Sequence, residues 1–165
     1  MRIEPITSGH RQALVDFVGR ISLQDRYFVD RTLISPVAIA SWTQAVPERR
    51  LVAVEDDGSI SGLLTIARGP GWSSHTADVR LVVDSTQRGR GIGRALAEAG
   101  IELAASMKIE KLSVETMSAN SGAQATFVPL GFAVEARLPG GIRDDQGELQ
   151  EIVILSHWLT SPGGR

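Results

Sequence analysis

The sequence predicts one α/β domain, covering residues 1–165, with a mixed sheet of about seven strands flanked by about four helices. Hydrophobic residues make up 42% of the 165 positions and charged residues 22%, a balance that supplies a core for one domain. The dipeptide Asp57-Gly58 lies between two apolar runs and predicts an antiparallel hairpin. A strand, a glycine-rich turn, a long helix and another strand follow, and such a crossover makes its two strands parallel.

The N-terminal half alternates between helical and extended patterns. Residues 1–7 predict a short strand, and residues 8–21 place Leu14, Val18 and Ile21 at the spacing of one helix face. A second helix is expected from Ser35 to about residue 46, because serine caps helices and the proline after it suits the first helical position. The two strands of the hairpin are then residues 50–55 and 59–68.

The C-terminal half contains the longest expected helix. Its residues 91–107 carry Ile92, Leu96 and Leu103 on one stripe, and strands at 77–84 and 111–116 flank it. Asn120 caps a shorter helix that is expected to continue to Leu130. Two last strands, 132–137 and 151–155, are joined by a loop rich in glycine and aspartate. The predicted order is therefore β-α-α-β-β-β-α-β-α-β-β.

Composition and charge exclude several classes of protein. The formal net charge is −2, whereas nucleic-acid-binding proteins usually carry a basic excess, so no nucleic-acid partner is expected. No run approaches the roughly 18 apolar residues of a membrane span, and Glu4 and Pro5 lie where a signal peptide would be apolar. We therefore expect a cytoplasmic protein without a membrane partner. The absence of cysteine excludes disulfides and a cysteine nucleophile, and the histidines show no metal-ligand spacing.

Residues 81–96 carry the most informative pattern. A hydrophobic strand leads into Gly89, Gly91 and Gly93, and a long helix follows this turn. Glycine accepts positive φ angles and a close ligand, while the helix start offers free N–H groups and the positive end of its dipole. Arg88 and Arg94 add positive charge at the two ends of the turn. Together these features predict a binding site for a phosphate group.

Other interpretations of the turn compete with this one. The spacing and the missing lysine exclude a P-loop. A dinucleotide site would need GxGxxG, and here Gly89 and Gly91 are followed by Arg94 in place of the third glycine, although Glu115 ends the next strand as a ribose-binding acid would. A turn that binds no ligand is a further alternative. Against it, three close glycines cost chain entropy, and the three arginines of the turn would repel one another.

Two short patterns resemble those of the GCN5-related N-acetyltransferase (GNAT) family. The first, (Q/R)-x-x-G-x-(G/A), is present as Arg88, Gly91 and Gly93. The second, N-x-x-A-x-x-x-(Y)-x-x-x-G-F, is matched by Asn120, Ala123, Phe127, Gly131 and Phe132. Both patterns stand in the family's order and separation, and the predicted order of elements matches the family's fold over essentially the whole chain. The resemblance therefore implies the GNAT-like acyl-CoA N-acyltransferase fold.

The resemblance also implies an enzyme that transfers an acetyl group from acetyl-CoA to a primary amine, by direct attack of the amine on the thioester. It leaves open whether the acceptor is a small-molecule amine or a protein lysine. A homodimer, which is common in the family, stays open as well. The cofactor-binding residues that the resemblance implies are Leu81, Val82 and Val83 for the pantetheine arm, Arg88, Gly89, Arg90, Gly91, Ile92, Gly93 and Arg94 for the pyrophosphate, and Asn120 and Phe127 beside the cofactor.

Acetyl transfer to an amine requires a group that removes a proton from the ammonium form. Asp78, on the strand that leads to the turn, is the first candidate for this base, and Glu115 is the second. A surface or paired carboxylate without a catalytic role is the alternative for each. Phe127 stands where the family usually has a tyrosine general acid, and phenylalanine cannot donate a proton. A catalytically weak acyl-CoA-binding sensor domain is therefore the alternative to an active enzyme.

Overall fold

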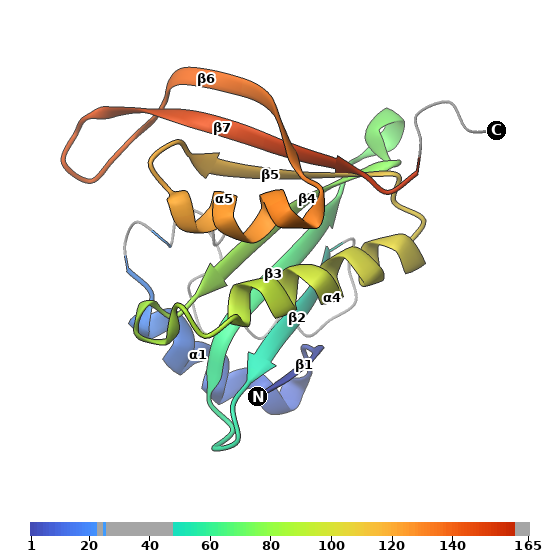
Figure 1. Cartoon of the computed structure of the whole chain (residues 1–165). Coiled ribbons are helices and arrows are strands. Elements are labelled where there is room, and N and C mark those ends of the chain that lie inside the picture. Colours follow the sequence, from blue (N-terminus) through green and yellow to red (C-terminus); the bar gives the residue numbers. More distant parts are fainter. Residues whose placement is uncertain (23–24, 26–47, 161–165) are drawn as a thin grey trace. The chain divides into compact units, whose positions relative to one another are not determined.

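The computed structural model describes residues 1–22, 25 and 48–160. In chain order its strands and α-helices are β1 (Arg2–Pro5), α1 (Arg11–Arg20), β2 (Glu48–Val54), β3 (Ile60–Arg68), β4 (Thr76–Val83), α4 (Ile92–Ser106), β5 (Lys111–Met117), α5 (Ser121–Phe127), β6 (Ala133–Arg143) and β7 (Leu149–Trp158) (Figure 1). The described ranges thus contain three α-helices rather than about four. The helix expected from Ser35 to about residue 46 lies outside them.

The seven strands form one sheet in the order β1-β2-β3-β4-β5-β7-β6. Strand β1 pairs antiparallel with β2, and β7 pairs antiparallel with both β5 and β6. Strand β4 is parallel to β5, with Thr76 opposite Lys111 and Asp78 opposite Ser113. The mixed sheet that the sequence predicts is therefore confirmed, including its parallel crossover pair. The insertion of β7 between β5 and β6 is a long-range arrangement that local patterns do not indicate.

The described residues belong to two compact units, each of which has its own set of buried side chains. The first unit comprises residues 1–66 and 80–100. Its core combines Leu14, Phe17, Val18 and Ile21 from the first helix segment with Val52, Val54, Ile60, Leu63 and Val82 from the strands. This confirms the helical spacing read from residues 14–21. Helix α4 lies close to β3, since a Cβ added at Gly62 would stand 2.7 Å from Cδ1 of Leu96.

The second unit comprises residues 67–79 and 101–165. Its core includes buried side chains from β5 and β7, among them Leu112, Val114, Val153 and Leu155. The hairpin of β6 and β7 is long in Figure 1, and both strands extend beyond the predicted ranges. Residues 138–143 were expected in a loop, but β6 continues to Arg143 because its register shifts between Leu138 and Ile142, which accommodates the proline and two glycines between them.

The helix expected over residues 120–130 is shorter in the structure. Helix α5 ends at Phe127, and Val128–Leu130 form a 3-10 turn with Pro129 near its start. Proline has no N–H to donate to the preceding turn of an α-helix, so the helix ends where proline is reached. Gly131 then takes a left-handed conformation, with φ of 91°. Among the described residues, no helix is long and apolar enough to cross a membrane.

Candidate functional site: a glycine turn and two carboxylates

The glycine turn lies in the first unit, between β4 and α4. A 3-10 turn, Ser85–Gln87, follows β4, and α4 begins at Ile92. Gly89 and Gly91 have φ angles of 78° and 79°, and a Cβ added at either would meet no atom within 4 Å. The left-handed backbone, rather than a lack of space, is therefore what favours glycine at both positions. The open space in front of them is the kind of cradle that a bound phosphate would fill.

Helix α4 supplies the donors for an anion at this turn. Its first helical hydrogen bond is from the N–H of Ala95 to the carbonyl of Gly91, at 3.0 Å. The N–H groups before Ala95 therefore have no helical acceptor, as at the start of any α-helix. A helix of 15 residues also places the positive end of its dipole here. The residues at the turn fit a pyrophosphate group in both geometry and charge.

The three arginines of the turn are each held by a carboxylate. Arg88 donates to Asp25 at 2.8 Å, and Nε of Arg94 lies 2.8 Å from Oε1 of Glu98. Nη2 of Arg90 lies 3.4 Å from Oε2 of Glu55. The sequence suggested that these arginines would repel one another in the absence of a ligand. Each arginine has a carboxylate partner among the described residues, and these pairs offset the repulsion without a ligand.

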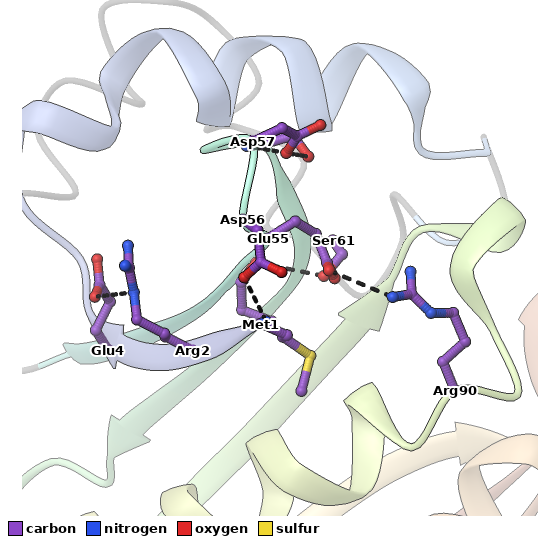
Figure 2. A network of polar contacts seen from close by, with 10 residues as sticks. Met1, Arg2, Glu4, Glu55, Asp56, Asp57, Ser61 and Arg90 are labelled. Carbon is purple, nitrogen blue, oxygen red and sulfur yellow. Dashed lines mark hydrogen bonds and ion pairs between the residues drawn. The ribbon is translucent and has the colours of Figure 1, made fainter.

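Glu55 follows the last residue of β2, and Figure 2 shows Arg90 directed toward it. The Glu55 side chain is 16% exposed, and its Oε1 atom is buried without a hydrogen-bond partner among the described residues. The next residue, Asp56, binds the N-terminal amine of Met1 at 3.0 Å (Figure 2). Glu55 therefore has spare acceptor capacity next to the turn.

The residues expected along the pantetheine arm form the end of β4. Val82 is buried in the core of the first unit, while Leu81 and Val83 are half-buried. The parallel register between β4 and β5 covers Thr76–Asp78, so residues 81–83 lie beyond the part of β4 that pairs with β5. The first unit thus brings Leu81–Val83 and the glycine turn together in one continuous stretch of chain.

The two candidate bases lie in the second unit, on one face of the sheet. Asp78 pairs with Ser113 in the parallel register, so their side chains share a face, and Glu115 is two residues beyond Ser113 on the same strand. Both carboxylates are on exposed residues. The structure therefore places Asp78 and Glu115 on a common solvent-accessible face, as a base that receives a proton from a substrate requires.

Asn120 and Phe127 lie at the two ends of α5 in the second unit. Oδ1 of Asn120 accepts a hydrogen bond from the N–H of Ala123 at 3.2 Å, which confirms the predicted helix cap. Phe127 is 2% exposed and packs edge-on against Phe132, with ring centroids 5.0 Å apart. The phenylalanine that replaces the family's tyrosine is thus a core residue in this chain.

Sequence reasoning missed the residues that contact the turn or its start, including Glu55 and Glu98 and three others. Asp84 is buried and binds Arg20, the last residue of α1, while Asp25 binds Arg88. Aspartate two positions before threonine, directly after a strand, is a local capping signal that could have identified Asp84. Arg20 and Asp25 are 64 and 63 residues away from their partners, and no local pattern indicates such pairs.

Comparisons with known proteins identify the family of this chain. Residues 17–132 match the model of the acetyltransferase (GNAT) family. A candidate phosphinothricin acetyltransferase of Bacillus subtilis (strain 168), YwnH, is 24% identical over 135 residues, which span 79% of this chain and 82% of that protein. The structure of smu.2055 from Streptococcus mutans UA159 superposes with a TM-score of 0.83 at 25% identity, covering 97% of this chain and 100% of that one.

A second solved structure shares the fold and contains the cofactor. That of yncA, a candidate acetyltransferase from Salmonella typhimurium solved with its cofactor acetyl-CoA, gives a TM-score of 0.82 at 17% identity, covering 99% of this chain and 96% of that one. The family match extends over more than half of the residues, so the chain belongs to the acetyltransferase (GNAT) family. It is an acetyltransferase that uses acetyl-CoA, as the two sequence patterns implied.

Proposed function

We propose that this enzyme is an N-acetyltransferase that moves the acetyl group of acetyl-CoA to a primary amine. The observation that carries the proposal is the turn at Gly89 and Gly91, where two left-handed glycines precede the N-terminus of α4. In a chain of this family, such a turn is suited to the pyrophosphate of CoA. We assign the whole of residues 1–165 to one acetyltransferase domain.

The cofactor contacts that we propose follow the elements described above. The N–H groups of residues 88–94 would bind the pyrophosphate, and the backbone of Leu81–Val83 would bind the pantetheine arm as a neighbouring strand does. Asn120 and Phe127 would lie beside the cofactor. The open space at the glycines, the helix start and the position of residues 81–83 beyond the part of β4 that pairs with β5 support these roles.

The reaction would be a direct acyl transfer. A carboxylate, Asp78 first and Glu115 second, would take a proton from the ammonium group, either directly or through water. The neutral amine would then attack the thioester carbonyl, form the new C–N bond and, as the C–S bond breaks, release CoA as a thiolate. The nitrogen loses its second proton after the attack, and, because Phe127 has no hydroxyl, this proton would reach the thiolate through water. The exposure of both carboxylates supports this route.

The acceptor that we propose to test first is the amino group of a small amino-acid-like molecule. The basis is the relative YwnH, whose name assigns it to the acetylation of phosphinothricin. A protein lysine is the second acceptor, and both are primary amines. These classes can be separated by a screen in which the release of the CoA thiol is measured with amino acids, phosphinothricin, polyamines and lysine peptides. Turnover with a lysine peptide alone would reject the small-molecule acceptor.

A catalytically weak domain that senses acyl-CoA is the second candidate function, and the burial of Phe127 favours it. Such a domain would bind acetyl-CoA tightly and release no thiol above the uncatalysed rate with any amine in the screen. Thiol release at enzymatic rates with one amine would reject the sensor function.

Calorimetric titration with acetyl-CoA tests the proposed cofactor site. The variant Gly91→Ala adds a Cβ where φ is 79°, and it should weaken binding because the turn must relax. Gly58→Ala is the matched control, since Gly58 has φ of 83° and equally open surroundings in the β2–β3 hairpin. We expect both variants to lose similar stability and only Gly91→Ala to lose affinity. Unchanged affinity in Gly91→Ala would place the cofactor elsewhere.

A further inference from the structure

Asp84 connects the end of β4 to the glycine turn, and its side chain is 4% exposed. Its Oδ1 atom accepts hydrogen bonds from the N–H of Thr86 at 3.0 Å and from the Thr86 hydroxyl at 2.7 Å. Its own N–H donates to the carbonyl of Ser61 at 2.9 Å, and its carbonyl accepts from the N–H of Gln87 at 2.9 Å. The residue is therefore bonded through both its main chain and its carboxylate.

The other carboxylate oxygen of Asp84 is bound by Arg20. Nε of Arg20 donates to Oδ2 of Asp84 at 2.9 Å, and Nη2 donates to the carbonyl of Ile60 at 2.9 Å. Arg20 is the last residue of α1, where a positive charge is favoured by the helix dipole. One guanidinium thus ties the end of α1 to the start of β3 and to the start of the turn.

The pKa of the Asp84 carboxyl agrees with an ionised group at this position. Burial acts to raise this pKa, but the hydrogen bonds from Arg20 and Thr86 outweigh burial and hold the pKa below its ordinary value. A buried carboxylate that is fully hydrogen-bonded and paired is strongly dependent on its partners, because the loss of one leaves a charge uncompensated.

The position of Asp84 matters because it is one of two buried anchors that flank the exposed part of the turn in the described structure. At one end Asp84 holds the 3-10 turn Ser85–Gln87, and the Gln87 amide oxygen accepts a hydrogen bond from Arg90. At the other end Ile92, the first residue of α4, is 2% exposed in the core. Residues 88–91 between these anchors are exposed. The direction of their N–H groups therefore depends on where the two anchors lie as well as on the ion pairs of Arg88 and Arg90.

We propose that Asp84, held by Arg20, is a positioning residue for cofactor binding, which fixes the turn so that its N–H groups face the pyrophosphate. This role rests on the proposed cofactor site at the same turn. When the N–H groups of the turn already point in the right direction, the loop does not have to be ordered on binding, and the ligand therefore binds more tightly. Neither residue needs to touch the cofactor for this effect.

The variant Asp84→Asn tests the role with little change in volume. Asparagine keeps one oxygen for Thr86 but presents an NH₂ group to the Nε–H of Arg20, so two donors face each other. We expect the Kd of acetyl-CoA to rise about tenfold, the usual cost of losing one hydrogen bond to a charged group. The Kd of S-acetylpantetheine, which has no pyrophosphate, should change less than about twofold.

Two further variants separate positioning from general damage to the fold. Arg20→Gln breaks the same ion pair from its 44% exposed partner, so it should raise the Kd of acetyl-CoA as Asp84→Asn does, even where Asp84→Asn folds poorly. Asp144→Asn is the matched control, because Oδ1 of Asp144 accepts from the N–H groups of Gln146 at 3.0 Å and Glu148 at 2.8 Å. This aspartate also holds a tight turn through its side chain, but it lies in the second unit, and its replacement should leave the affinities for acetyl-CoA and S-acetylpantetheine unchanged.

The results have distinct meanings when Gly91→Ala is measured beside them. The positioning role is wrong if folded Asp84→Asn and Arg20→Gln bind acetyl-CoA as tightly as the wild type does. It is also wrong if their affinities for acetyl-CoA and for S-acetylpantetheine fall by the same factor. If Gly91→Ala alone changes the ratio of the affinity for acetyl-CoA to the affinity for S-acetylpantetheine, the cofactor site stands and only the role of Asp84 is rejected. If none of the variants changes this ratio, the cofactor site at the turn is rejected as well.

Discussion

The Nη2 atom of Arg88 lies 2.8 Å from both carboxylate oxygens of Asp25. The carboxylate occupies the donors that a phosphate would use, since carboxylate and phosphate compete for the same guanidinium group. Asp25 is 21% exposed and Arg88 is 54% exposed, so solvent weakens the pair, and it can be exchanged for a ligand at modest cost. Each of the three arginines of the glycine turn is therefore paired with a carboxylate in the structure, and a phosphate that bound there would have to displace Asp25 from Arg88.

This pairing predicts that Asp25→Asn tightens the binding of acetyl-CoA. Removing the negative charge releases Arg88 and takes away a repulsion toward the phosphates, and we expect the Kd to fall about two- to fivefold at low salt. Glu151→Gln is the control, because it removes a comparable carboxylate from Arg137 in the second unit. Calorimetry at low and high salt measures the Kd of acetyl-CoA for both variants. Weaker binding in Asp25→Asn would show that Asp25 supports the site rather than competing with the cofactor.

The two candidate bases predict different kinetic outcomes. If Asp78 is the base, Asp78→Asn should lower kcat about a hundredfold and leave the Kd of acetyl-CoA unchanged, because general base catalysis contributes about 10²–10⁴ to rates. Glu115→Gln should then lower kcat only slightly. If Glu115 is the base, Glu115→Gln should show the large loss of kcat and Asp78→Asn the small one. Near wild-type kcat in both variants, at saturating amine, would mean that neither carboxylate takes the proton.

The buried ring of Phe127 predicts a stability effect that is larger than any effect on chemistry. Phe127→Ala removes the edge-on contact with Phe132 and should lower the free energy of unfolding by about 3–5 kcal/mol. Phe127→Leu, which fills more of the space, should cost about 1–2 kcal/mol. Urea denaturation at neutral pH measures both. A loss in Phe127→Ala well under 1 kcal/mol would show that the ring does not support the core of the second unit.

The lowered pKa of Asp84 predicts a specific dependence of stability on acid. A carboxyl whose pKa is lower in the folded state binds protons more readily when unfolded, so its stabilisation is complete well above about pH 4 and is lost as the pH falls further. Asp84→Asn lacks this group, and its free energy of unfolding should fall less between about pH 5 and pH 3 than that of the wild type. Urea denaturation across this range measures the difference. Parallel curves for the two proteins would contradict it.

The same comparison is insensitive to the other perturbed carboxyls of the chain. Hydrogen bonds from Ser59, Lys111 and Gln150 lower the pKa values of Asp57, Glu135 and Asp144, respectively. These groups also lose stabilisation in acid, but they are present in both proteins. Their contribution therefore cancels in the difference between wild type and Asp84→Asn.

Local sequence patterns were sufficient for the type and order of the described elements. The stripe on α4, the Asn120 cap and the Asp57-Gly58 turn each depend on residues a few positions apart, and such short-range preferences act wherever the chain is placed. The positive φ angles at Gly89 and Gly91 were predictable for the same reason. The catalytic role of Asp78 or Glu115 stays a prediction.

Only the tertiary structure decided the partners of the charged groups. Whether Arg88 meets a ligand or Asp25, and whether Asp84 is a surface residue or a buried anchor for Arg20, depends on segments more than 60 residues apart. The placement of β7 between β5 and β6 and the burial of Phe127 are decided in the same way. Periodicity and capping are local, whereas ion pairs and burial arise from long-range packing, and that is why the sequence alone determined the elements and the glycine turn but not the contacts that hold the turn in place.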